Sequence, residues 1–598
     1  MRRAAYVLVG LLLAGSAILG CGEDNAAAPA EADVAITPDA GKDSNTTTPE
    51  VTLPDIMTLP DTKPDVPEPR DPCELIGAGH CMMPFPSDHF RIDERLDFSQ
   101  ATLQEGIDPT QLGGSDGYSV VTPVVFYLEG GTLKDTASVL DIARSLDADS
   151  PTRVVNVETG EPVAHWVELD HFSVAADVPI YTLRFAAPLA FGQRYVVGVR
   201  GLVDADLTAL LPTPFFAELR ETEAFFEDTL SFLGPTFATP GDVQLAWAFT
   251  TASAEHGTRD LLSVRDVILA EVGDAGAPIT VDDVIEYEGD EDIALRLEAT
   301  AHVPSVLLDP DDLGVRRVWW DDIGGALITG TEDVPVDIWI PHSVVDAPGP
   351  VPILQYGHGL FGSRKEAENG WIRAMANRLG FIVVASDMQG MSEVDVGVWG
   401  VVLTADVTAV GSLPEQPFQG FCNHLAIARA LKTFAHEGIT VDPARVYYYG
   451  NSQGGTIGSL LMSLQTDIER GVLGVPGGAY SLLLNRSTGF SEFAGILKIP
   501  FPDPMAFTVA FALIQTVMDR MDPMAYAHLT APRRVLLQVA KEDSQVQNDV
   551  SFLLGRALGA RLMVPTPRPL FGFEETAYPF EGTALVEYDF NKPDNPNP

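Results

Sequence analysis

One serine lies in a glycine-rich stretch whose residue types could support nucleophilic chemistry. Ser452 is the third residue of GNSQGG, 450–455, which follows the aromatic and β-branched run Val446 to Tyr449 and precedes the apolar run Thr456 to Leu464. This order predicts a strand, a sharp turn and a helix. Small residues are needed at such a turn because a Cβ would collide with the neighbouring strand or helix. The alternative interpretation is an ordinary glycine-rich turn between a strand and a helix.

The strand, the Gly-x-Ser-x-Gly turn and the helix together resemble the nucleophile elbow of α/β-hydrolases. The stretch GHGLFG, 357–362, closely resembles the oxyanion loop of lipases and esterases in that family, and it follows a buried-strand pattern. The resemblance implies that Ser452 attacks an acyl carbon. It also implies that backbone amides at Gly359, Leu360 and Gln453 hold the developing oxyanion. His358 is interpreted as a structural residue that orients the loop, rather than as a catalytic base.

The resemblance also implies an acid after the penultimate strand of the sheet. Asp543 follows the strand-like run Val535 to Val539 and stands in an Asp-x-x-Val setting. It is therefore the candidate acid of a catalytic triad, with Glu542 as the second choice. The alternative is a solvated turn after a strand.

The histidine of the triad is missing from its expected place. In this family the order along the chain is serine, acid, histidine, but no histidine follows His528. The last predicted strand, Thr583 to Phe590, leads only into residues 591–598. The resemblance therefore predicts a histidine immediately beyond Pro598. The alternatives are a non-catalytic relative that has lost its base, or substitution by His528 or His424.

The elements that must position these residues alternate in type from about Ala294 onward. Strand-like and helix-like runs follow one another, which predicts a parallel sheet with helices on both faces. A capping box, Ser363 to Glu366, predicts a helix that runs to Leu379 and stops at Gly380. The fold class indicated for 276–598 is α/β, with the doubly wound sheet of an α/β-hydrolase.

The region 71–275 has a different pattern. Short strand-like runs are separated by frequent turn signals, which predicts a β-sandwich. The run from Pro188 to Val199, together with Phe249 to Thr251, resembles bacterial Ig-like modules. The stretch PFPSD, 84–88, followed by this β-rich region, resembles the N-terminal domain of a family of surface-exposed bacterial lipases.

The N-terminus has the features of an exported lipoprotein. A short basic segment precedes an apolar stretch, Tyr6 to Gly20, that is too short to span a bilayer as a mature helix. ILGC, 18–21, resembles a bacterial lipobox, which implies a signal peptide at 1–20 and lipidation of Cys21. The residue after Cys21 is Gly22 rather than aspartate, a pattern that resembles outer-membrane rather than inner-membrane lipoproteins. The predicted location is therefore the bacterial cell envelope, at the outer membrane. The alternative is an ordinary signal peptide with an incidental cysteine. Residues 21–70 lack aromatics and predict a disordered tether.

The remaining cysteines and the charge limit the partners. Cys73 and Cys81 are close in sequence in a chain predicted to be exported, which predicts a disulfide. Cys422 is interpreted as a buried free thiol. The net charge of −47 argues against nucleic acid as a partner. The sequence carries no dinucleotide, P-loop or zinc-protease motif, so no cofactor or metal is predicted.

The function indicated is hydrolysis of a lipid or other apolar acyl ester at the cell envelope. The alternatives are a surface binding protein on an impaired hydrolase scaffold and a prolyl-oligopeptidase-type peptidase, although no propeller repeat is visible. The segment 485–521 contains the apolar run Met505 to Met518, which predicts either core packing or a lid over an apolar pocket. Trp371, Trp399 and Met388 could add to such a pocket. The sequence does not indicate an oligomeric state.

Overall fold

A computed structural model describes residues 79–99, 101, 103, 112–237, 239–345, 347–405, 407–530 and 533–590. These residues belong to one compact unit, Asp71–Pro598. The predicted signal peptide 1–20, the lipidation site Cys21 and the tether 21–70 lie outside the described residues, so they stay predictions. The predicted domain boundary between 275 and 276 also stays a prediction. It falls at a short 3₁₀ turn, Gly273–Ala275, directly after α5 (Ala254–Val272).

Two three-stranded antiparallel sheets form the β-rich region. One contains β3 (Val124–Phe126), β6 (Tyr181–Phe185) and β5 (His165–Leu169), and the other contains β4 (Thr152–Asn156), β7 (Arg194–Arg200) and β8 (Val243–Thr250). Aromatic rings join the two sheets, because Phe126 lies 5.9 Å from Trp247 and Phe185 lies 6.3 Å from Phe249 between centroids. The region is therefore a small β-sandwich, which confirms the predicted class.

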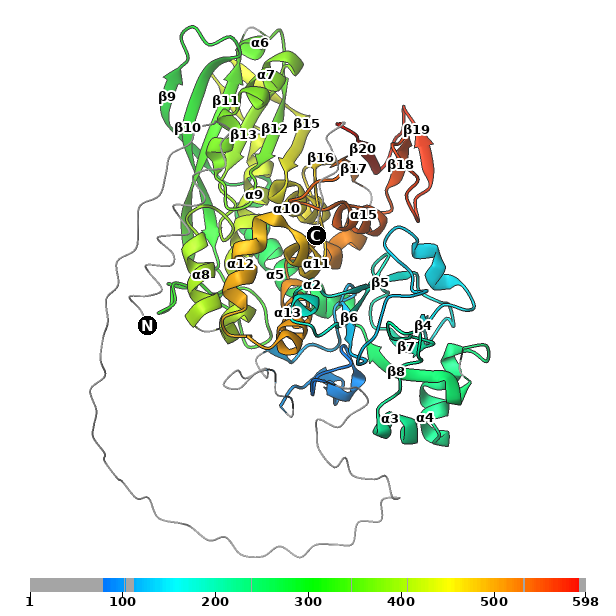
Figure 1. Cartoon of the computed structure of the whole chain (residues 1–598). Coiled ribbons are helices and arrows are strands. Elements are labelled where there is room, and N and C mark those ends of the chain that lie inside the picture. The colour runs from blue at the N-terminus through cyan, green and yellow to red at the C-terminus, as the bar shows by residue number, and fades with distance from the viewer. Residues whose placement is uncertain are drawn as a thin grey trace, which may run out of the picture. The chain divides into compact units, whose positions relative to one another are not determined.

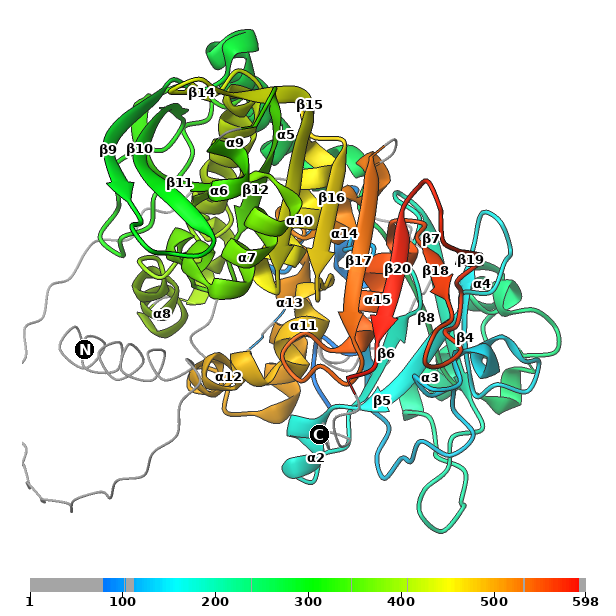
Figure 2. The same ribbon diagram turned by 90° about the horizontal axis from the view of Figure 1, so that it is seen from above.

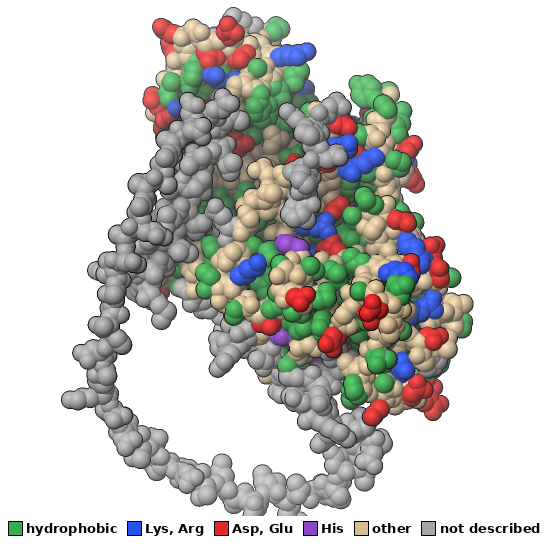
Figure 3. Space-filling view, viewed as in Figure 1, with side chains coloured by type: hydrophobic (Ala, Val, Ile, Leu, Met, Phe, Trp, Pro, Cys, Tyr) green, Lys and Arg blue, Asp and Glu red, His purple; other side chains and the backbone are tan. Residues whose placement is uncertain are grey.

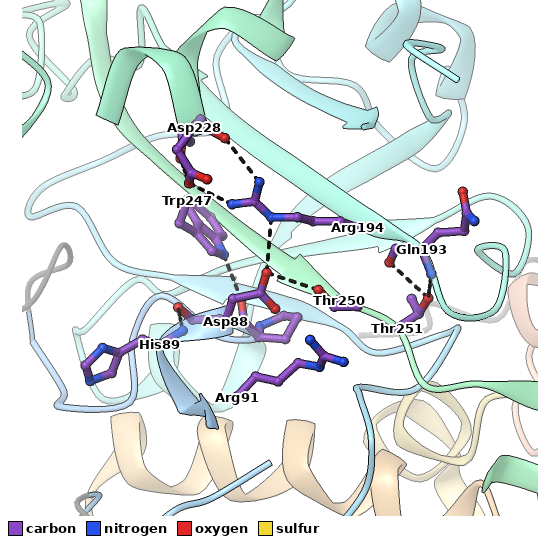
Figure 4. Close-up of polar contacts among 12 residues, drawn as sticks. Asp88, His89, Arg91, Gln193, Arg194, Asp228, Trp247, Thr250 and Thr251 are labelled. Carbon is purple, nitrogen blue, oxygen red and sulfur yellow. Dashed lines mark hydrogen bonds and ion pairs between the residues drawn. The ribbon is translucent and has the colours of Figure 1, made fainter. Parts of the chain in front are cut away.

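The stretch PFPSD, 84–88, attaches to the second sheet of the sandwich (Figure 4). Trp247 Nε1 donates a hydrogen bond of 2.8 Å to the carbonyl oxygen of Pro86. Asp88 Oδ2 accepts from Thr250 Oγ1 at 3.1 Å and from Arg194 Nε at 3.3 Å. Arg194 also pairs with Asp228 at 2.7 Å. The polar groups of this motif thus anchor the segment to β7 and β8.

A large mixed sheet forms the second half of the chain. Its hydrogen-bonded order is β19 (Glu575–Ala577), β18 (Arg561–Val564), β20 (Ala584–Tyr588), β17 (Arg534–Ala540), β16 (Arg470–Gly474), β15 (Ile439–Asn451), β12 (Val351–Gly357), β13 (Ile382–Ser386), β11 (Gly330–Pro341), β10 (Ile293–Ser305) and β9 (Ile279–Glu286). Neighbours from β13 to β19 are parallel, whereas β13, β11, β10 and β9 pair antiparallel. The parallel sheet with antiparallel opening strands confirms the prediction.

Helices cover both faces of this sheet (Figure 2). α9 (Glu415–Leu431), α10 (Gln453–Leu464) and α15 (Asn548–Ala557) pack on one face, and α7 (Gly370–Leu379) packs on the other. α7 ends at Gly380 in the left-handed conformation, as predicted. Its start differs from the prediction. The chain forms a 3₁₀ turn at Arg364–Glu368 and breaks at Asn369 before α7 begins, and Ser363 makes no side-chain cap.

Four helices gather at the edge of the sheet toward which the parallel strands point. They are α8 (Val396–Ala405), α11 (Tyr480–Arg486), α12 (Ser491–Leu497) and α13 (Pro504–Met518) (Figures 1 and 2). α13 begins at a favourable Pro504, and Asp503 caps its first turn. Within the described ranges, no helix combines the length and the apolar character that crossing a bilayer requires.

Charged side chains of both signs are visible on one face of the molecule (Figure 3). On the face drawn in Figure 3, acidic side chains are interspersed with basic and apolar ones. The net charge of −47 is nevertheless strongly negative, and phosphate backbones are repelled by such a charge. The expectation that nucleic acid is not a partner stays a prediction.

Candidate active site

Ser452 stands on a strained turn between β15 and α10. Its backbone angles are φ 56° and ψ −117°, which a non-glycine residue adopts only when its surroundings enforce them. Its N–H donates to the carbonyl oxygen of Gly474 on β16 at 2.9 Å. Gln453 is the first residue of α10, so its N–H has no partner within the helix and points out of the helix N-terminus. The turn therefore presents a serine hydroxyl beside an available amide.

The glycines of the turn are required by close backbone contacts. A Cβ on Gly450 would lie 2.5 Å from the carbonyl oxygen of Gly454. A Cβ on Gly454 would lie 2.1 Å from the carbonyl oxygen of Gly357, at the end of β12. These distances show that the serine turn and the loop after β12 touch through their backbones. The strand order, the crossover helices and this turn together determine the fold class. The second half of the chain has the α/β-hydrolase fold.

Comparison with solved structures finds enzymes of this fold at low similarity. Acetyl xylan esterase 1 from Thermoanaerobacterium sp. JW/SL YS485 aligns with a TM-score of 0.34 at 15% identity, over 57% of this chain and 89% of that one. An acetyl xylan esterase from Paenibacillus sp. R4 aligns with a TM-score of 0.35 at 16% identity, over 56% of this chain and 90% of that one. A CE15 glucuronoyl esterase from Teredinibacter turnerae T7901 aligns with a TM-score of 0.30 at 13% identity, over 56% of this chain and 85% of that one. No family model and no curated protein matches the chain. The fold assignment rests on the chain's own topology.

The loop after β12 is braced from two sides. His358 is buried, its Nε2 accepts from the N–H of Met388 at 2.8 Å, and its Nδ1 lies 2.8 Å from the carbonyl oxygen of Gly359. Both ring nitrogens are therefore used for structure, which agrees with the interpretation of His358 as an orienting residue.

The backbone N–H of Gly359, one of the predicted oxyanion donors, already donates a hydrogen bond within the protein. The N–H of Gly359 donates to Glu366 Oε2 at 2.6 Å, and Glu366 Oε1 accepts from the Tyr356 hydroxyl at 2.9 Å. Gly359 was expected to supply an oxyanion amide, and this contact corrects that expectation. The amide of Leu360, the next residue, is the candidate that remains on this loop. Glu366 itself was expected to cap a helix, but its carboxylate holds the loop instead.

Asp543 lies at the same edge of the sheet as Ser452. Asn451 pairs with Gly474, and Gly474 pairs with Gln538, so the end of β15 is level with Gln538, and β17 continues from there to Ala540. One strand separates them, which places the two strand axes about 9.6 Å apart. Asp543 Oδ1 accepts the N–H groups of Gln545 and Val546 at 2.8 and 3.0 Å. These bonds fix the carboxylate in the turn after β17.

Glu542, the second choice for the acid, has other contacts. Its φ is +61°, its N–H donates to Asn548 Oδ1 at 2.8 Å, and its carboxylate lies 3.4 Å from Lys541 Nζ. Its carboxylate is thus paired with a lysine on the same turn. Asp543 remains the better candidate, and its role stays a prediction.

The histidines named as substitutes for the base serve other contacts. His424 is fully buried, its Nδ1 lies 3.5 Å from Ser386 Oγ, and burial lowers its pKa to about 3. The His528 ring packs against Phe191 with centroids 5.2 Å apart. All 11 histidines of the chain fall within the described ranges, and no hydrogen bond there joins one of them to Ser452 or Asp543.

The end of β20 lies beside the Asp543 turn. Ala540 on β17 pairs with Tyr588 on β20, and the N–H of Lys541 donates to the carbonyl oxygen of Tyr588 at 2.9 Å. Lys541 Nζ also lies 3.2 Å from Asp589 Oδ2. Chain that continues from β20 therefore leaves the sheet next to the candidate acid. Residues 591–598 lie outside the described residues.

An apolar cavity of about 50 Å³ adjoins the serine turn. Side chains from the oxyanion loop and from all four edge helices line it, among them Phe361, Trp399, Tyr480, Ala494, Ile514 and Met518. The side-chain amide of Gln453 reaches Met391 Sδ at 3.2 Å and the Tyr480 hydroxyl at 3.3 Å, and both of these residues line the cavity. Trp399 was expected here. Met388 and Trp371 are not among the lining residues: Met388 is buried behind His358, and Trp371 packs on Tyr449.

α13 is both a core helix and the floor of this cavity. Most of its side chains are buried, and Phe511, Ile514 and Met518 line the cavity. The two interpretations of the apolar run, core packing and pocket cover, therefore both apply to one helix.

A larger cavity of about 300 Å³ lies on the Asp543 side, and charged and amide side chains line about half of it while apolar side chains line the rest. We call it the polar cavity to distinguish it from the fully apolar one. Asp543 and Glu542 line the polar cavity, together with Arg486, Asp549, Arg556 and Arg568. Val139, Leu140 and Ile142 of the sandwich region close one side. Arg486 pairs with Asp549 and with Glu168, and Arg568 pairs with Glu587 at 2.7 Å. Burial lowers the pKa of Arg556 to about 10. Sequence reasoning missed this cavity because its residues come from segments hundreds of positions apart.

The cysteine predictions are only partly within reach of the structure. Cys422 is buried in α9 with a free thiol, as predicted. Cys81 is described and its sulfur is not free. Its predicted partner Cys73 lies outside the described residues, so the bridge stays a prediction. Within the described ranges, no group of three or more metal-ligating side chains is present.

Proposed function

We propose that this protein is a serine carboxylic-ester hydrolase. The observation that carries the proposal is the strained Ser452, whose turn touches the oxyanion loop through the backbone contact of Gly454 with Gly357. A strained nucleophile next to preorganised amides suits acyl transfer. The apolar cavity beside the turn supports an apolar acyl group. The sandwich in the N-terminal region offers no support for the propeller-containing peptidase alternative.

Each residue then has a definite role. The Ser452 hydroxyl attacks the ester carbonyl, and the amides of Leu360 and Gln453 donate to the oxyanion that forms. Glu366 and His358 hold the oxyanion loop in place through Gly359 and Met388. Asp543 orients the base that takes the serine proton and later gives it to the leaving alcohol.

The base is proposed to reach the site from chain that continues beyond β20. The support is the position of the end of β20, beside Lys541 and the Asp543 turn. A histidine carried there would lie between an acid and a serine at the same edge of the sheet. A serine hydroxyl without such a base is a poor nucleophile at neutral pH.

The test is labelling with a fluorophosphonate, which forms a covalent bond to an activated serine. It should be applied to this chain and to a form extended at its C-terminus that contains a histidine, with Ser452→Ala as the control. We expect the extended form to give an adduct on Ser452 that is lost in the control, and the present chain to react more slowly because it lacks the base. An extended, folded form that gives no Ser452 adduct would falsify the hydrolase proposal and favour the alternative of a surface binding protein.

We further propose that the protein is a lipoprotein of the cell envelope, anchored through Cys21. The support is the signal-like sequence before Cys21 and the lipobox resemblance at 18–21. Mass analysis of the mature protein should find an N-terminal cysteine with attached acyl chains. An unmodified N-terminus at another residue would overturn the anchor. The Ig-like relationship of the sandwich also stays a proposal.

A further inference from the structure

We propose that the substrate is an ester of a short apolar acyl group with a polyhydroxylated alcohol, and that the two cavities receive these two parts separately. This inference rests on the proposed function. It narrows the substrate, because it excludes the long acyl chains of membrane lipids.

The apolar cavity lies on the acyl side of the serine. Its lining includes Phe361, the neighbour of Leu360 on the oxyanion loop, and it includes two residues that contact the Gln453 side chain. The carbonyl oxygen of a bound ester must point at the amides of Leu360 and Gln453. The chain attached to that carbonyl then enters the adjoining cavity.

The size of this cavity limits the acyl chain. A water-sized group needs about 10–15 Å³ of such volume, so the 50 Å³ cavity holds about four such groups. An acyl group of about two to five carbons fits, since its carbonyl carbon stays outside at Ser452. A chain of twelve or more carbons exceeds this volume, so it would have to project out of the cavity or displace the floor.

The floor of the cavity is clamped by the sandwich region. The Phe507 ring of α13 packs on Phe172 with centroids 5.2 Å apart. Asp519, just after α13, accepts a hydrogen bond of 2.7 Å from Ser119 Oγ. Lys498, at the end of α12, lies over the Phe172 ring with its Nζ 3.8 Å from the centroid. Outward movement of α13 therefore has to break contacts between the two halves of the compact unit.

The leaving alcohol belongs on the opposite side. The base that takes the serine proton returns it to the alcohol oxygen, so the alcohol lies on the side of Asp543. The polar cavity is on that side and is lined by Asp543 itself. α11 separates the two cavities, because Leu484 lines the apolar one and Arg486, two residues later, lines the polar one.

The chemistry of the polar cavity matches hydroxyl groups. About half of its lining is apolar or aromatic, including Trp166, Phe552 and Phe571, and the rest is polar. Most of the charged groups already have partners of opposite charge: Arg486 pairs with Asp549 and Glu168, Arg568 with Glu587, and Glu542 with Lys541. The lining therefore combines apolar faces with hydrogen-bonding groups and leaves no strong unpaired charge for an ionic ligand. A hydroxyl group both donates and accepts hydrogen bonds. A neutral alcohol with several hydroxyls therefore fits this lining better than an anion or a cation does.

The acyl half is tested with a series of alkylphosphonofluoridates with ethyl, butyl, octyl and dodecyl chains. The serine oxygen bonds to phosphorus, fluoride leaves, and the serine proton goes to the base. We expect the butyl reagent to label Ser452 at least tenfold faster than the dodecyl reagent. Equal or faster labelling by dodecyl overturns the short-chain inference and leaves the hydrolase proposal standing. These rates are measured on the folded, C-terminally extended form that contains a histidine. If no reagent labels that form, the hydrolase proposal is overturned, and this inference with it.

Two variants of the cavity lining should move the preference in opposite directions. Ile514→Ala enlarges the floor and is expected to speed octyl labelling about tenfold relative to butyl. Ala494→Leu fills the cavity and is expected to slow butyl labelling while ethyl labelling stays near the parent rate. A preference that neither variant changes shows that the acyl chain lies elsewhere, and overturns the assignment of this cavity.

The alcohol half is tested with butylphosphonofluoridates whose alkoxy group is either cyclohexyl or a methyl glucoside. The glucoside reagent is expected to label at least tenfold faster. Leu140→Trp, at the exposed mouth of the polar cavity, should remove that advantage. Leu211→Trp, an equally exposed position outside the cavity lining, should preserve it. Equal rates for the two reagents, or equal effects of the two variants, overturn the assignment of the polar cavity to the alcohol.

Discussion

A single methyl group at Gly454 should disable the site through backbone geometry. In Gly454→Ala the new Cβ would lie 2.1 Å from the carbonyl oxygen of Gly357, whereas Cβ contacts under 3.0 Å are essentially never seen. The serine turn and the end of β12 must therefore separate by about 0.9 Å or more. Gln453 moves with the serine turn, and Leu360 moves with the loop after β12. The two candidate oxyanion amides then no longer converge.

The magnitude follows from what such amides contribute. Loss of one oxyanion donor lowers kcat by about 100- to 1000-fold, and a 1 Å misplacement costs about 100-fold. We therefore expect fluorophosphonate labelling of Ser452 to slow by about 100-fold in Gly454→Ala. The overpacking should also lower the free energy of unfolding by about 1–3 kcal/mol.

The assay is the second-order labelling rate, with thermal unfolding measured on the same samples. Gly370→Ala is the matched control, because its added Cβ meets nothing within 4 Å. The reasoning is refuted if folded Gly454→Ala labels within about threefold of the parent. In that case the contact between the turn and the oxyanion loop does not set the reactivity of Ser452.

Three further predictions concern neighbouring features. Glu366→Gln weakens the charged acceptor of the Gly359 N–H, so labelling should slow about tenfold; an unchanged rate contradicts the bracing role. Burial, together with the Asp522 carboxylate, raises the pKa of Asp519 from 3.8 to about 8. The folded state then holds a proton that the unfolded chain releases, so its stability falls from about pH 4 to pH 8. Urea unfolding should show that the free energy of unfolding falls less between pH 5 and pH 8 in Asp519→Asn than in the parent. Non-reducing mass mapping should find Cys73 bridged to Cys81, and two free thiols would disprove the pair.

The turns that carry Ser452 and Asp543 could be predicted because each is a local pattern. A strand, a small-residue turn and a helix are contiguous around Ser452, and a strand followed by a turn is contiguous around Asp543. Carboxyl ends of parallel strands meet at one edge of a sheet, so two local patterns gave one shared location. The chain's topology then confirmed the fold class.

The role of Glu366 could not be predicted because a local rule competed with a tertiary contact. A serine three residues before a glutamate predicts a capping box, but the carboxylate binds the Gly359 N–H and the Tyr356 hydroxyl. The helix consequently starts six residues later than its capping signal indicated, at Gly370. The same contact removed Gly359 from the predicted oxyanion donors. A sequence motif cannot show which of two nearby N–H groups a buried carboxylate will reach.

The cavities were beyond sequence reasoning for a related reason. Cavity volume depends on how well side chains from separate elements fill the space between them, to a precision of single methylene groups. The apolar run of α13 indicated burial, but it did not indicate that a cavity of only about 50 Å³ would lie against this helix. Trp399 and Trp371 were equivalent candidates in the sequence, and only the packing separates the one that lines the cavity from the one that does not.

The sandwich region should therefore be regarded as part of the site rather than as an appendage. It holds α13 through the contact of Phe172 with Phe507 and through the hydrogen bond of Ser119 to Asp519 just after the helix. It also closes the polar cavity through Val139, Leu140 and Ile142. A change in the sandwich that loosens α13 would enlarge the acyl cavity without touching Ser452. Under the proposed function, sequence variation at these contacts would alter which esters are accepted while the chemical step stays the same. The second half of the compact unit thus carries Ser452, Asp543 and most of the cavity lining, and the sandwich region supports that lining from outside.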